Sequence, residues 1–274
     1  MANIIIPLWF YEFGSLMYIL SSVVAFLVSY FSFRLYRYSK SRKHLFLSAA
    51  FAFVTFGLAV LTIGNAVSYL NFVECRPNCR IDPSDVTYLW IRFGNYGYYV
   101  ASTIGYVLLA LSYFKTDFKS KSNSKTRIKG RKLLLSTLLL LPILLPVFLP
   151  APLPPILPAF DITIFIPQQQ TFVLFPFINP YFQTFHILSS IMLAYIVLQV
   201  LPNYFRTKSR LSLLVLLSFL AILLYHVLMF AVAVSPIYFA LAHFSLLAGF
   251  GMLLLMLVKV GFDERTKIKD ASHR

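Results

Sequence analysis

Long apolar runs alternate with short polar segments along most of the chain. An α-helix rises 1.5 Å per residue, so a bilayer core of about 30 Å needs roughly 20 mostly apolar residues. Seven runs predict transmembrane helices, at residues 12–33, 45–72, 86–114, 133–149, 181–201, 211–234 and 237–260. We therefore expect an all-α integral membrane protein, with a seven-helix bundle over residues 1–260 and a tail over residues 261–274.

Basic residues lie almost entirely on one side of these predicted helices. Twenty-one of the 24 Lys and Arg residues occur in the segments after the first, third, fifth and seventh runs, including a basic loop at 115–132. Only Arg76, Arg80 and Arg92 belong to the opposite side. Cytoplasmic loops carry the excess of Lys and Arg, which places the N-terminus outside and the C-terminus in the cytoplasm of a multi-pass cell-membrane protein.

Composition agrees with a membrane location and excludes several classes of protein. Hydrophobic residues make up 59% of the chain and charged residues 12%, with a mean hydropathy of +0.78. Soluble enzymes, disulfide scaffolds and disordered proteins do not have this composition. The net charge of +15 flanks the predicted helices, and we expect it to attract anionic inner-leaflet lipids and no nucleic acid. Hydrolytic motifs and phosphate-binding loops are absent, so we do not expect an enzyme.

Two outside loops carry features of their own. The loop at 73–86 contains Cys75 and Cys79, and an oxidising compartment favours a local disulfide between them. The loop at 150–180 has two β-rich runs around a polar turn, which predicts a small extracellular β-hairpin. Such a hairpin would serve either as a lid over the bundle or as a docking surface for a partner.

Ionisable residues inside the predicted helices are few, and each is a candidate functional residue because it is expensive to bury in lipid. Arg92 lies among polar and small residues, so we expect it to face the bundle interior. Three histidines lie at a similar depth, roughly 8–12 Å below the outer boundary at 1.5 Å per residue. They would ligate a metal, hold a haem iron axially, or hydrogen-bond to hydroxyls and carbonyls. They are His186, His226 and His243.

Three segments share their residue order with a known family. Pro7 and Trp9 lie just before the first predicted helix, which contains the run 26–28. The third predicted helix contains the run 90–96, and the last contains Gly-Phe-Gly at 249–251. These segments resemble the microbial rhodopsins, which are seven-helix retinal proteins. The resemblance implies that a set of nine residues surrounds the former chromophore pocket: Arg92, Asn95, Tyr96, Tyr99, Met192, Tyr225, His226, His243 and Leu247.

Departures from the family pattern exclude its photochemistry. Leu247 occupies the position of the Schiff-base lysine, and no lysine lies in the middle of any predicted helix. Asn95 and His243 occupy the positions of the two counterion aspartates, and Tyr106 occupies that of the internal proton donor. Covalent retinal is therefore not expected, because no amine is available to form the linkage.

Three functional hypotheses remain. The first is a non-photoactive, rhodopsin-like sensor, receptor or binding subunit that works through a separate partner chain or as a homo-oligomer. The alternative is a membrane electron-transfer subunit with haem or metal on His226 together with His243 or His186. A transporter or channel is less favoured, because the inner half of the predicted helices lacks a charged pathway.

Overall fold

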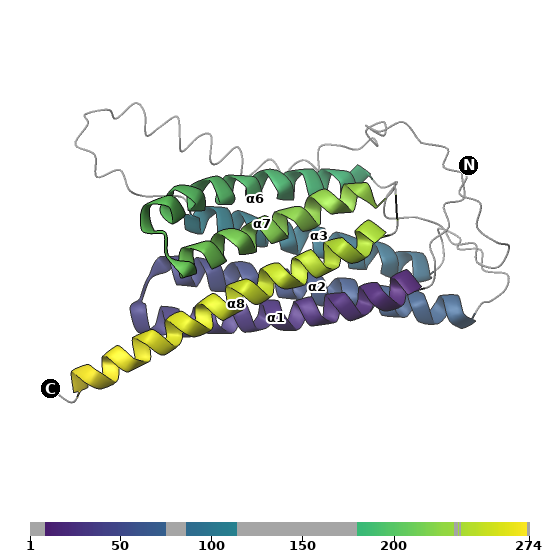
Figure 1. The fold of residues 1–274 in the computed structure, drawn as a ribbon. Helices are drawn as coiled ribbons and strands as arrows, with labels where there is room; N and C mark the ends of the chain where they lie inside the picture. The colour runs from purple at the N-terminus through teal and green to yellow at the C-terminus, as the bar shows by residue number, and fades with distance from the viewer. Residues whose placement is uncertain (1–8, 75–85, 114–179, 233–234, 236, 273–274) are drawn as a thin grey trace, which may run out of the picture.

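The computed structural model describes residues 9–74, 86–113, 180–232, 235 and 237–272, and it is all-helical over this part of the chain. Its helices are long and almost parallel to one axis (Figure 1). In chain order they are α1 (Trp9–Ser39), α2 (Arg42–Glu74), α3 (Val86–Tyr113), α6 (Pro180–Thr207), α7 (Arg210–Ala231) and α8 (Ile237–Ser272).

Two tight turns of the same design reverse the chain at the basic end of the bundle. A single lysine follows α1 and α6, Lys40 with φ 52° and Lys208 with φ 47°. In both turns the lysine N–H donates to the carbonyl oxygen four residues earlier, at 2.8 Å and 2.7 Å. Ser209 then caps α7, because its hydroxyl accepts from the backbone N–H of Ser212 at 3.1 Å. A left-handed residue and a serine cap end one helix and start the next within a few residues.

The described helices form a closed ring. Each helix packs against the next one in the chain, α3 against α6, and α8 returns to pack against α1. Neighbouring helices are antiparallel except α3 with α6 and α1 with α8, each pair of which runs in one direction (Figure 1). Tyr113 and Pro180, on either side of the undescribed segment 114–179, therefore lie at opposite ends of the bundle.

Large apolar side chains cover the outside of the ring as well as its core. Phe56, Leu198 and Leu255 are more than half exposed, whereas Phe51 and Phe250 meet in the centre with ring centroids 5.4 Å apart. Water does not tolerate so large an apolar surface, but lipid does. Five helical segments are apolar and long enough to cross a membrane: Glu12–Ser39, Arg42–Val67, Phe182–Thr207, Arg210–Ala231 and Ile237–Phe262. Tyrosines, glycines and an arginine lower the hydropathy of α3, which is not among them.

Glycines bring the backbones of some neighbouring helices into direct contact. A Cβ atom added at Gly64 would lie 3.0 Å from Gly94 Cα, and one added at Gly105 would lie 2.8 Å from the Ala50 carbonyl oxygen, which locks α2 against α3. At Gly249 of α8, an added Cβ would lie 2.9 Å from a carbonyl oxygen of α7. Small residues permit this close approach in membrane bundles.

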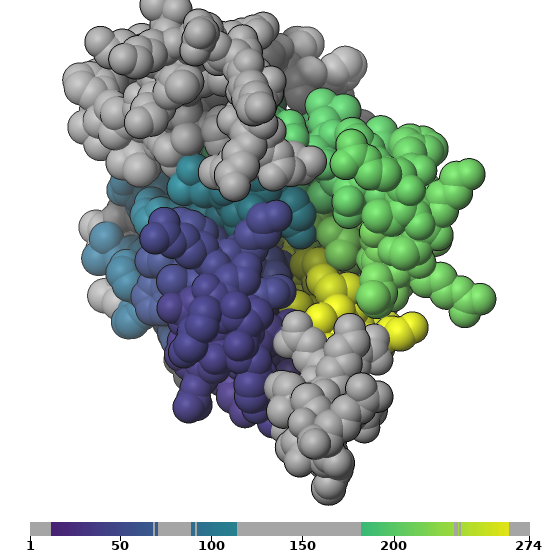
Figure 2. Space-filling model, turned by 90° about the vertical axis from the view of Figure 1, so that its left-hand side faces the viewer, coloured from purple at the N-terminus to yellow at the C-terminus, as the bar shows by residue number. Residues whose placement is uncertain are grey.

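The bundle accordingly divides into an N-terminal half (α1, α2 and α3) and a C-terminal half (α6, α7 and α8). Contacts within each half are more extensive than the α1–α8 and α3–α6 contacts between the halves. We call the surface between the halves the seam. Seen along the axis from the basic end, α8 lies between the α1–α3 side and the α6–α7 side (Figure 2).

The structure corrects the predicted fold. It has six helices over the described residues, and no strand occurs among them, so the prediction of a seven-helix bundle with an extracellular β-hairpin is wrong there. The run at 133–149, the hairpin at 150–180, the basic loop at 115–132 and the proposed Cys75–Cys79 disulfide lie outside the described residues. The hairpin was inferred from β-propensity, which depends strongly on context. α8 also continues through most of the predicted tail.

Candidate functional site

A chain of buried hydrogen bonds crosses the seam in the centre of the bundle. His186 on α6 and His226 on α7 meet through their Nδ1 atoms at 2.8 Å. The other ring nitrogen of His226, Nε2, lies 3.0 Å from the Tyr106 hydroxyl of α3. All three side chains are almost completely buried. The chain therefore links three helices and joins the C-terminal half to the N-terminal half.

The geometry of this chain allows two directions of hydrogen bonding. In one, His186 Nδ1–H donates to His226, and His226 Nε2–H donates to the Tyr106 oxygen. In the other, the Tyr106 hydroxyl donates to His226 Nε2, and His226 Nδ1–H donates to His186. A neutral imidazole has one donor and one acceptor nitrogen, so reversing one bond reverses the other. The three groups therefore change their hydrogen bonding together.

A second hydrogen bond crosses the seam beside the first. The hydroxyls of Tyr98 on α3 and Tyr225 on α7 lie 3.2 Å apart, and both side chains are buried. The Tyr225 ring makes edge contacts with the rings of all three predicted histidines, with centroids 4.8–5.8 Å apart. Phe185 packs on the same group, stacking on Tyr99 with centroids 4.8 Å apart. The site is thus a compact aromatic cluster in which polar tips pair across the seam.

His243 lies on the other side of Tyr225 and is held differently. Its Nδ1–H donates to the carbonyl oxygen of Phe239, one turn earlier on α8, at 2.7 Å. Its Nε2 atom is buried and finds no hydrogen-bond partner among the described residues. The ring also makes an edge contact with Tyr18 of α1, with centroids 4.8 Å apart. His243 therefore presents an unpaired acceptor to the aromatic cluster, where unmet polar groups are costly.

This arrangement does not fit the metal or haem site that the three histidines suggested. Two nitrogens bound to one zinc at 2.0–2.1 Å are separated by about 3.3 Å or more, and axial haem ligands are further apart. The His186 and His226 nitrogens are only 2.8 Å apart, as in a hydrogen bond. Within the described residues, no group of three His, Cys, Asp or Glu side chains is arranged to hold a metal ion. In this arrangement His186 and His226 are hydrogen-bonded to each other and do not share a metal ion.

The remaining predicted pocket residues are only partly brought together. Met192 is buried in the core, while Asn95, Tyr96 and Leu247 are half-buried. Arg92 is exposed, contrary to the expectation that it faces the interior, and its guanidinium lies 5.6 Å from the centre of the Tyr96 ring. Arg92 is two positions before the buried Gly94, which is about 200° around the helix, so the two residues are on nearly opposite faces of α3.

The structure adds three tyrosines to the predicted site. Tyr98 was not among the nine predicted residues, Tyr106 was expected only at an altered proton-donor position, and Tyr18 was not singled out. A signal for the first two was present, since a spacing of eight places Tyr98 and Tyr106 on one face of α3. Their partners on α7 are more than a hundred residues away in sequence, so no local pattern identifies the pairs.

No protein-family model, curated protein or solved structure matches the chain. The resemblance to microbial rhodopsins therefore stays a prediction. The functional argument depends on the geometry of the seam.

Proposed function

We propose that the chain is a non-photoactive membrane sensor or receptor-like subunit that transmits a change at its seam to a separate partner chain. The observation that carries the proposal is the buried His186–His226–Tyr106 chain across the seam. Polar groups at this depth are expensive in a membrane protein and mark functional elements by default. A switching protein needs an element with two arrangements of similar free energy, and a reversible hydrogen-bond chain is one.

The packing of the two halves supports motion at the seam. Gly105 locks α3 to α2 and Gly249 locks α8 to α7 by backbone contact, and helix pairs held in this way move as units. The seam is instead closed by side-chain hydrogen bonds and aromatic edges, which exchange partners more easily than interlocked backbones. A ligand or a proton that favours one hydrogen-bond direction would then change how the halves meet.

The basic end is the proposed output surface. Arg42, Lys208 and Arg210 are exposed there, at the two turns that belong to different halves. Under the positive-inside rule this end faces the cytoplasm. A partner that contacts both turns would register their relative displacement.

Photochemistry is not part of the proposal. Leu247 is a half-buried residue near the middle of the spanning segment of α8, Ile237–Phe262, at the position where the rhodopsin pattern has its lysine. Lys259 lies near the basic end of that segment and is exposed. Neither side chain supplies an amine to the aromatic cluster.

Distances between spin labels test whether the seam controls the arrangement of the halves. Labels at Arg42→Cys and Arg206→Cys, with the native cysteines changed to serine, report on opposite halves at the basic end. Labels at Arg206→Cys and Leu241→Cys report within the C-terminal half. We expect Tyr106→Phe to shift or broaden the first distance distribution and to leave the second unchanged. An unchanged distribution between the halves would reject the proposed switch.

Photo-crosslinking tests the partner. A photoreactive amino acid at Arg210, in cells that naturally make the protein, should yield a crosslinked chain whose amount changes at least twofold in the Tyr106→Phe background. The same probe at Leu16, exposed on α1 away from the basic end, is the matched control. A crosslink insensitive to Tyr106 would separate partner binding from the seam and contradict signalling through it.

A further inference from the structure

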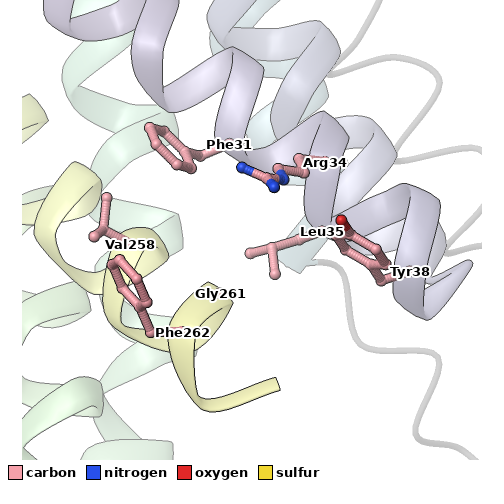
Figure 3. A pocket seen from close by; sticks show the side chains of 7 residues that line it. All are labelled: Phe31, Arg34, Leu35, Tyr38, Val258, Gly261 and Phe262. Carbon is pink, nitrogen blue, oxygen red and sulfur yellow. The ribbon is translucent and has the colours of Figure 1, made fainter. Parts of the chain in front are cut away.

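A cleft opens between α1 and α8 at the basic end, away from the seam hydrogen bonds. Phe31, Arg34 and Tyr38 line it from α1, and Val258 and Phe262 line it from α8 (Figure 3). Its cavity volume is small, about 40 Å³, and the cleft is open to the surroundings. Both helices reach the end of their membrane-spanning segments here, at Ser39 and Phe262. The cleft is therefore at the depth where lipid headgroups meet the acyl region.

Small side chains keep this cleft open. Gly261 faces it from α8, and a Cβ atom added there would still be 4.0 Å from the nearest neighbouring atom, Cδ2 of Leu35. At Gly64, Gly105 and Gly249, by contrast, an added Cβ would lie 2.8–3.0 Å from a backbone atom of the neighbouring helix. Gly261 thus leaves space, whereas these three glycines close it.

Arg34 gives the cleft its charge. The residue is half-buried, and Figure 3 shows its guanidinium between Phe31 and Leu35, at the edge of the gap between the helices. Among the residues whose side chains the structure describes, the single carboxylate is that of Glu12, near the other end of α1. A half-buried guanidinium is stabilised by an anion that accepts its forked N–H donors, and phosphate suits that geometry.

The apolar lining indicates that the phosphate belongs to a ligand with an acyl chain. Phe31 and Val258 lie on the membrane-interior side of the cleft, along which an acyl chain would lie, whereas Phe262 lies at its basic end, where the spanning segment of α8 stops. Tyr38 adds an aromatic ring with a polar tip at the interface, a position that such rings favour. Arg37 and Lys259 are exposed near the same end and raise the local positive potential.

We propose that the α1–α8 cleft binds one anionic phospholipid, with its phosphate on Arg34 and an acyl chain against Phe31 and Val258. The cleft lies at the basic end of the seam, but this binding rests neither on the seam hydrogen bonds nor on the proposed signalling. It adds a specific lipid site to the general attraction between the basic end and an anionic leaflet.

Native mass spectrometry of the full-length protein in detergent tests the site. The protein is titrated with phosphatidylglycerol, with phosphatidylcholine of the same acyl chains, and with inorganic phosphate. We expect one phosphatidylglycerol to bind at least tenfold more tightly than later ones, and Arg34→Gln to remove that preference. Arg37→Gln deletes the same charge outside the cleft and should retain it. Gly261→Leu fills the cleft without changing charge and should also abolish it.

Four results would overturn the proposal. If Arg34→Gln and Arg37→Gln lose the preference for the first phosphatidylglycerol equally, the lipid is held by diffuse attraction. The same conclusion follows if Gly261→Leu retains that preference. Equal affinity for phosphatidylcholine would mean that the apolar lining alone binds. Competition by inorganic phosphate would assign the site to a soluble phosphate. Thermal unfolding of each variant shows whether it is folded. If one of the Arg34 and Gly261 variants does not fold, the other still tests the site.

Discussion

Substitution of two glycines in α8 gives the sharpest test of how the halves are built. A Cβ atom at Gly249 would lie 2.7 Å from Ile222 Cγ1 and 2.9 Å from the Ser218 carbonyl oxygen. Carbon atoms in contact prefer 3.5–4.0 Å, so α7 and α8 must separate by about 1 Å. Overpacking of this kind costs about 1–3 kcal/mol. At Gly251 the same atom meets nothing within 4 Å, and helix propensity favours alanine by up to about 1 kcal/mol.

We therefore expect Gly249→Ala to lower the free energy of unfolding by about 1–3 kcal/mol and Gly251→Ala to leave it unchanged or slightly raised. Reversible unfolding in mixed detergent micelles measures both, followed by far-UV circular dichroism. The two variants differ only in position, so chain entropy and helix propensity largely cancel in the comparison. Equal stabilities would refute the close α7–α8 contact and with it the description of the C-terminal half as a locked unit.

The remaining predictions concern the seam and the absent chromophore. Tyr106→Phe should destabilise the protein by about 0.5–2 kcal/mol, because it leaves His226 without its hydroxyl partner. Tyr113→Phe, seven residues further along α3, should have a smaller effect in the same unfolding assay. A larger effect of Tyr113→Phe would show that the Tyr106 hydrogen bond is not the important one. A double-mutant cycle of Tyr98→Phe and Tyr225→Phe should give a coupling free energy near 0.6 kcal/mol, and a value of zero would show that these hydroxyls do not pair. Incubation of the purified protein with all-trans retinal should produce no stable visible band that survives washing, since Leu247 offers no amine; a band that survives would contradict this.

The helix limits illustrate what local pattern can predict. The apolar runs at 12–33, 45–72 and 211–234 correspond to α1, α2 and α7, with boundaries that differ by several residues. Such runs can be recognised in the sequence because a segment that crosses lipid must pair its backbone polar groups within one continuous helix. The prediction of seven helices and a hairpin shows the limit of the method, since the described residues contain six helices and no strand.

The candidate site was predicted in part. The burial of His186, His226 and His243 follows from the cost of exposing imidazole to lipid, and the structure buries all three. Their metal or haem role does not follow, because depth alone does not set ring orientation. The structure turns His226 toward His186 and Tyr106, while His243 bonds its own helix.

The sequence by itself determined that this is a chain of long apolar helices with a basic side, because hydropathy and charge are summed over each segment and need no knowledge of neighbours. Only the tertiary structure decided which polar groups pair across the seam, that Arg92 points outward, and that Arg34 borders an open cleft beside Gly261. Those outcomes depend on the rotation of each helix about its axis and on which faces meet. Both are fixed by side-chain packing among helices far apart in the chain.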